Sequence, residues 1–83
     1  MRITKETIEF QVEALNSLLG VSNNRNTVGA YFFQRSEGVF ALRRTANNEG
    51  GAYDIASYNT IKGLHAYLSG MIAVLRDNRL LGV

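Results

Sequence analysis

The chain has 83 residues, no cysteine and no proline, and its nine Lys and Arg residues against seven Asp and Glu give a formal net charge of +2. This length favours a single domain over residues 1–83. The lack of cysteine excludes disulfides and thiolate metal sites, and a charge of +2 falls short of the dense basic stripe typical of nucleic-acid-binding proteins. We expect a soluble, cytoplasmic domain without metal or cofactor.

Residues 3–20 are predicted to form a first helix. Thr4 is expected to cap its start, and Gly20 suits the left-handed position that ends a helix. Phe10 lies outside the apolar stripe, so we expect it either to cover the edge of the core or to contact a partner or a second copy. The stripe itself recurs at helical spacing and consists of Ile8, Val12, Leu15 and Leu19.

Two apolar runs joined by S-E-G predict a β-hairpin from about residue 28 to residue 45. A two-residue turn at Glu37-Gly38 would set Tyr31 opposite Arg44, whereas a three-residue turn would exchange the faces of the strands. We favour the first register because it separates large apolar groups from polar ones. It places Phe32 exposed on the open face, opposite Arg43. The set expected under the helices is Tyr31, Phe33, Phe40 and Leu42.

A third strand is predicted around Tyr53-Asp54-Ile55, with Asp54 pointing either outward or toward Arg43 or Arg44 across the sheet. We favour a cross-strand ion pair for Asp54. Tyr53 and Ile55 are expected to face inward. Ser57 or Asn59 is expected to cap a second helix that runs to about Asp77. The predicted fold is therefore α+β, in the order α-β-β-β-α, with two helices packed on one face of a three-stranded antiparallel sheet.

Two polar loops, residues 22–27 and 46–51, should meet at one end of the hairpin, because the first strand starts where the second ends. Loops on a rigid scaffold commonly carry function, although two ordinary solvated connections would look the same. We take this rim and the open face as the candidate partner-binding site. Its residues are Arg25, Phe32, Arg43, Arg44, Asn47 and Asn48.

Two glycines one heptad apart in the second helix indicate close packing on that side, either within the domain or against a second copy. The last two leucines depart from the helical stripe. The residues considered for self-association are Phe10, Gly63, Gly70, Leu80 and Leu81.

The chain lacks nucleotide-binding, zinc-protease and calcium-loop motifs, and its scattered carboxylates form no catalytic pair. We therefore expect a protein that is not an enzyme.

The element order resembles that of the double-stranded-RNA-binding domain, a resemblance that implies RNA binding through lysines at the start of the second helix. That segment here, Ser57 to Lys62, carries one lysine. A second resemblance, over roughly residues 12–72, is to small uncharacterised proteins encoded by bacteriophages and prophages. It is carried by G-A-Y-F-F, G-V-F-A-L-R-R, N-N-E-G-G-A-Y-D-I and L-S-G-M.

The second resemblance implies a small accessory protein that binds and modulates a host protein. Together these observations favour a non-catalytic protein-interaction module. The alternatives are weak nucleic-acid binding, with the loop arginines on phosphates and Phe32 as a stacking platform, and a structural homodimer.

Overall fold

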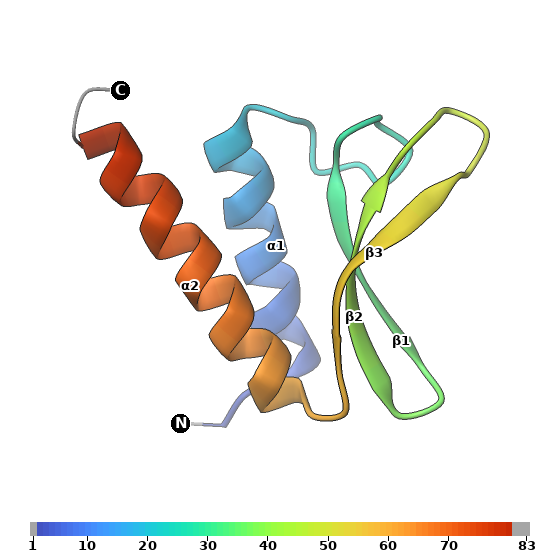
Figure 1. The fold of residues 1–83 in the computed structure, drawn as a ribbon, viewed down its shortest axis with the longest axis vertical. Helices are drawn as coiled ribbons and strands as arrows, with labels where there is room; N and C mark the ends of the chain where they lie inside the picture. Colours follow the sequence, from blue (N-terminus) through green and yellow to red (C-terminus); the bar gives the residue numbers. More distant parts are fainter. Residues whose placement is uncertain (1, 81–83) are drawn as a thin grey trace.

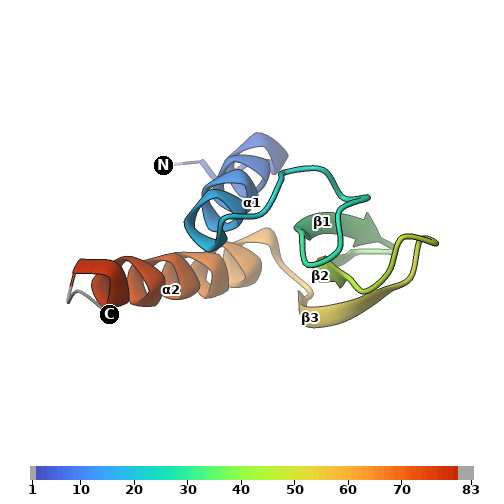
Figure 2. The same ribbon diagram turned by 90° about the horizontal axis from the view of Figure 1, so that it is seen from above.

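The computed structural model describes residues 2–80 and confirms the α-β-β-β-α order (Figure 1). Helix α1 (Lys5–Leu19) is followed by strands β1 (Tyr31–Ser36), β2 (Val39–Thr45) and β3 (Ala52–Tyr58) and by helix α2 (Ile61–Leu80). The strands form one antiparallel sheet in the order β1-β2-β3, so β1 and β3 are its edges. Seen from above, both helices lie on the same side of the sheet (Figure 2).

The ends of α1 match the predicted caps. The Thr4 side chain accepts a hydrogen bond from the Thr7 backbone N–H, and the Thr7 hydroxyl accepts one from the Thr4 backbone N–H. Gly20 closes the helix with φ 73°, in the left-handed region. One expectation for this helix is wrong: Leu19, the last residue of the predicted apolar stripe, is 38% exposed.

Helix α2 starts later and ends later than predicted. Neither Ser57 nor Asn59 caps it, because β3 continues to Tyr58. The Thr60 hydroxyl instead accepts a hydrogen bond from the Gly63 backbone N–H, at 3.1 Å. The helix also continues past Asp77 to Leu80.

The hairpin has the favoured register: Tyr31 pairs with Arg44, Phe32 with Arg43 and Phe33 with Leu42. Glu37 and Gly38 both have positive φ, at 51° and 79°, as a tight two-residue turn requires. The register between β2 and β3 shifts at Leu42/Arg43, so β3 carries an irregularity that the alternation did not predict.

Leucine, isoleucine and valine side chains of both helices meet the helix-facing side of β1 and β2 in one core. Phe33 and Phe40 were expected within it but lie at its margin, where their rings stack at 6.3 Å. Tyr53 was expected to face inward and is 47% exposed at the sheet edge. The buried core consists of Ile8, Val12, Leu15, Tyr31, Leu42, Leu64, Leu68 and Ile72.

A buried asparagine in α1 joins the helix to the sheet. The Asn16 side chain is fully buried; its Oδ1 accepts from the Tyr31 backbone N–H at 2.9 Å, and its Nδ2 donates to the Tyr31 carbonyl at 3.0 Å. Nδ2 also donates to Oδ1 of Asn23. We call the paired bonds to Tyr31 the Asn16 clamp. It satisfies backbone groups at an edge strand that would otherwise be buried without partners.

Replacing Asn16 with leucine should lower the free energy of unfolding by about 3 kcal/mol, because the Tyr31 N–H and C=O lose their partners while remaining buried. Asn48→Leu is the matched control, since Asn48 is exposed in the second polar loop, and it should change stability by less than about 0.5 kcal/mol. Urea unfolding of both variants tests this. A loss below about 1 kcal/mol for Asn16→Leu would contradict the role given to the clamp.

Candidate functional site

The two polar loops lie together as predicted. Arg25, Asn47 and Asn48 all line one small cavity of about 100 Å³, together with residues from both loops and from β3. Phe32 lines its wall, whereas Arg43 and Arg44 do not. The cavity is smaller than the roughly 300 Å³ at which ligand pockets usually begin.

Phe32 is not the exposed aromatic that we expected. It keeps its predicted place opposite Arg43, but only 8% of it is exposed, because the loop before β1 folds over this end of the open face. The Arg25 guanidinium lies 4.2 Å from the centre of the Phe32 ring, and the Thr45 hydroxyl donates to the Arg25 carbonyl. Among the residues that the structure describes, Arg25 thus already occupies the ring face that a base would need.

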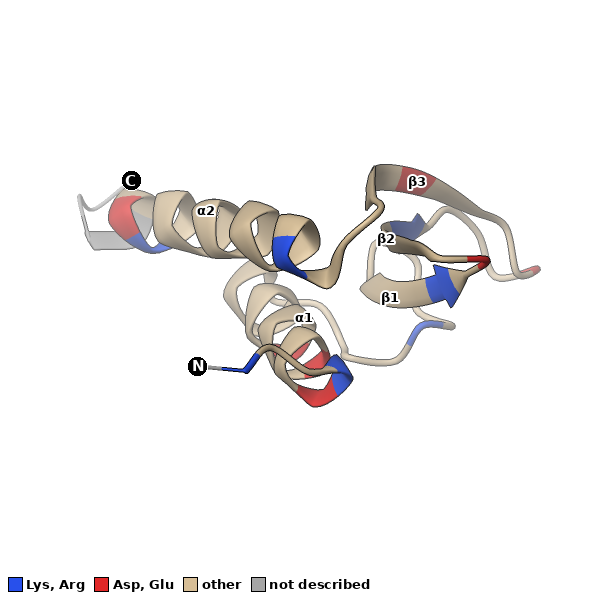
Figure 3. Ribbon diagram, turned by 90° about the horizontal axis from the view of Figure 1, so that it is seen from below, with Lys and Arg blue, Asp and Glu red and all other residues tan. Residues whose placement is uncertain are grey.

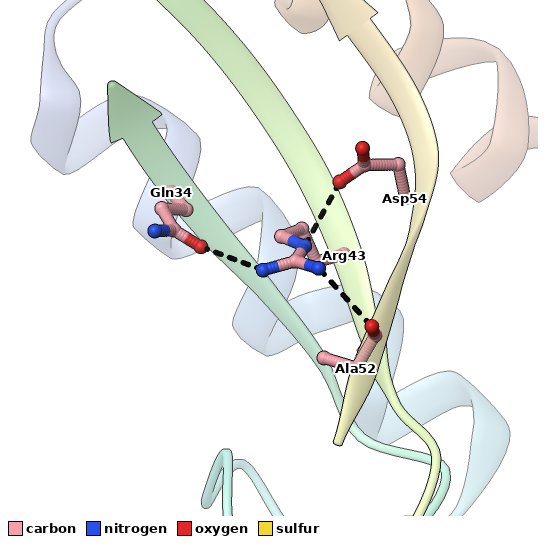
Figure 4. Close-up of polar contacts among 4 residues, drawn as sticks. All are labelled: Gln34, Arg43, Ala52 and Asp54. Atoms are coloured by element: carbon pink, nitrogen blue, oxygen red, sulfur yellow. Dashed lines mark hydrogen bonds and ion pairs between the residues drawn. The ribbon is translucent and has the colours of Figure 1, made fainter. Parts of the chain in front are cut away.

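Arg43 is held within the sheet by three partners (Figure 4). Its Nε lies 2.8 Å from Oδ1 of Asp54, one of the two cross-strand ion pairs that the sequence analysis left open. Its Nη1 donates to Oε1 of Gln34 at 3.2 Å, and its Nη2 donates to the Ala52 carbonyl at 3.1 Å. The planar guanidinium thereby links β1, β2 and β3 across the open face.

Arg44 points to the other face and does not belong to the rim. Its Nε donates to the Gly29 carbonyl at 3.1 Å, and its guanidinium lies 5.0 Å from the Tyr31 ring centre. Asn47 is likewise engaged locally, because its Oδ1 accepts from the backbone N–H groups of Glu49 and Gly51. Both side chains have local structural roles in this arrangement.

The residues considered for self-association are scattered. Phe10 is 73% exposed on α1. Gly63 is packed within the domain, since an added Cβ there would come within 2.9 Å of the Tyr58 ring, whereas a Cβ at Gly70 would meet nothing within 4 Å. The Leu80 side chain and Leu81 lie outside the described residues.

A larger surface that sequence reasoning missed lies between α1 and β1. Two clefts, of about 320 and 600 Å³, share Lys5 and Phe33 in their walls and so adjoin one another. We call them together the β1 groove. The groove lies between α1 and β1 and follows β1 from Tyr31, which the Asn16 clamp holds, to Arg35. Its apolar walls come from Ile3, Val12, Phe33, Phe40 and Ile61.

Most charged side chains that line the β1 groove are cationic: Arg2, Lys5, Arg25 and Arg35, against Glu9 alone. In Figure 3, blue segments lie at the start of α1, in the loop before β1 and at the end of β1, with red segments beside the blue one on α1. Glu9 lies 3.6 Å from Lys5 as an exposed i,i+4 pair. Among the side chains that line the groove, positive charges therefore outnumber negative ones, and they lie beside apolar residues.

Comparisons with protein-family models, with curated proteins and with solved structures gave no match. None of the helices over residues 2–80 is long and apolar enough to cross a lipid bilayer. The same residues contain no group of three or more His, Cys, Asp or Glu side chains placed to hold a metal ion.

Proposed function

We propose that the protein is a non-catalytic protein-interaction module that holds a segment of its partner in the β1 groove. One observation carries this proposal: an apolar wall, a sheet edge and four cationic side chains lie along the same groove. Such a combination suits a protein segment that has both apolar and acidic side chains.

The resemblance to phage-encoded proteins supplies a partner class, and it stays a prediction. On that reading the module acts in the cytoplasm and binds a host protein, whose function it modulates. The nucleic-acid alternative relied on Phe32 as a stacking platform and on Arg43 as a phosphate contact. Phe32 is buried beneath Arg25, and Arg43 is paired with Asp54 within the sheet. The cations of the β1 groove remain available to it, so nucleic acid serves below as a competing probe.

Selection from a displayed library of random peptides tests the proposed site. The wild-type chain should enrich peptides rich in Asp and Glu, and the double variant Lys5→Glu/Arg35→Glu should bind them at least about tenfold more weakly, since two attractions become repulsions. Both side chains are exposed, so the fold should survive.

The matched control is Lys62→Glu/Arg76→Glu, which makes the same charge change at exposed positions of α2 and should retain binding. Equal binding by the wild type and the groove variant would refute the site. Duplex RNA and DNA that displace the peptides and bind the wild type alone would favour the nucleic-acid alternative.

A homodimer is the second candidate, and a different surface favours it. A groove of about 580 Å³ beside α2 is lined almost entirely by apolar residues, among them Leu19, Tyr67 and Gly70. Val74 at its border is 60% exposed. Two copies of α2 that cross antiparallel at Gly70 would place Lys62 of one near Asp77 of the other, because these opposite charges lie at similar distances on either side of the glycine.

The substitution Gly70→Ala distinguishes a monomer from a dimer whose α2 helices cross at this glycine. In a monomer it should raise the free energy of unfolding by about 0.5–1 kcal/mol, because alanine is the better helix former and its Cβ meets no neighbour. In a dimer that crosses there, the methyl group should weaken association. Sedimentation velocity over a range of concentrations measures this, and a wild-type mass that stays monomeric at every concentration would exclude the dimer.

A further inference from the structure

We infer that the occupant of the β1 groove is an extended acidic segment that adds to β1 as a fourth strand of the sheet. This inference rests on the proposed function and specifies the form and chemistry of the partner segment. Its basis is the backbone of β1 together with the side chains of the groove.

The hydrogen-bonding direction of β1 follows from its first residues. The Thr45 backbone N–H donates to the Ala30 carbonyl, so this carbonyl faces β2, whereas the Ala30 N–H donates to the Thr27 carbonyl. The N–H and C=O of the next residue, Tyr31, both bond to Asn16 on the side away from β2. Because this direction alternates along an antiparallel strand, the groups of Tyr31, Phe33 and Arg35 face away from β2. Within residues 2–80, β2 is the one strand that pairs with β1.

The first of these three outward-facing positions is already bound in the manner of a strand. The Asn16 side-chain amide accepts from the Tyr31 N–H and donates to the Tyr31 carbonyl, the same exchange that a peptide group of a neighbouring strand would make. The clamp therefore begins a line of hydrogen bonds along this edge. An added strand would continue that line at Phe33 and Arg35, both of which line the groove.

The side chains of the groove specify what the added strand carries. Alternate residues of the strand would point toward the ring of Phe33, which favours apolar side chains there. The neighbouring Phe40 ring stacks with Phe33 and has the Arg35 guanidinium 5.2 Å from its centre. Cations occur in both clefts: Lys5 and Arg25 in the smaller, Arg2, Lys5 and Arg35 in the larger. The segment should thus have apolar residues in its middle and acidic residues toward its ends. A second copy of β1 would bring its own cations and be repelled.

Peptides with altered backbones test the strand directly. The probe is a synthetic peptide of about six residues, the usual length of a strand, with alternating valine and tyrosine at its centre and Asp or Glu at both ends. N-methylation of every second amide removes the donors on one edge of the peptide. Methylation on the edge that faces β1 should weaken binding about 30-fold, through the loss of about two hydrogen bonds, whereas methylation of the other edge should change it less than about threefold.

Isothermal titration of both methylated peptides against the wild type and the Lys5→Glu/Arg35→Glu variant separates the possible results. A large loss with one methylation pattern alone supports strand addition. Equal affinity for both patterns, with binding still lost in the charge variant, would overturn strand addition and leave the groove as a binding site. Peptide binding that the charge variant retains in full would refute the groove itself, and with it the inference.

Discussion

The two bonds between the Asn16 side chain and the backbone of Tyr31 determine how helix and sheet meet. A fully buried amide is costly unless its hydrogen bonds are made, and here both of its ends are bonded. The clamp joins α1 to the first residue of an edge strand. The packing of Ile8, Val12 and Leu15 buries apolar surface, but it allows small shifts of α1 relative to the sheet. The two hydrogen bonds of the clamp do not allow such shifts.

The Asn16 clamp also explains the position of the β1 groove. The clamp closes one end of the edge of β1 and leaves the rest of the edge without a strand neighbour among residues 2–80. The hairpin carries Phe33 and Phe40 beyond the part of the sheet that the helices cover, so these rings remain only partly buried. A small domain that buries a modest share of its surface has such places at its margins, and the cations that line this one are the reason for proposing an acidic partner.

The sequence predicts the helices and strands well and the candidate binding surface poorly. Periodicity and caps predict α1, and the separation of large apolar groups from polar ones predicts the hairpin register, because both signals are contained in short stretches of sequence. Asp54 was predicted to pair with Arg43 or Arg44, and the register between β2 and β3, which contains an irregularity, determines that the partner is Arg43. The role of Asn16 could not be predicted, since a polar residue next to a helical apolar stripe looks like a solvated border until the partner strand is known. The position of Asn16 beside this stripe was nevertheless a feature of the sequence that could have pointed to the clamp.

The arginines illustrate the same limit. Arg43 and Arg44 are adjacent in sequence and seemed to form a rim with Arg25, but alternation sends them to opposite faces, where each has a local structural partner. Phe32 is covered by Arg25, a loop residue whose position cannot be predicted from periodicity. Conversely, Arg2 and Lys5 at the start of the chain meet Arg35 of β1 around one groove, so tertiary packing alone reveals that these two segments belong together.

Amide hydrogen exchange of the free protein, followed by NMR, tests the central claim most directly. The account predicts that the Tyr31 amide exchanges slowly, because Asn16 holds it, whereas the Phe33 and Arg35 amides on the same edge exchange many times faster. Phe32 and Gln34, which face β2, should be protected and serve as the internal reference. Slow exchange at Phe33 and Arg35, or fast exchange at Tyr31, would contradict both the clamp and the open edge.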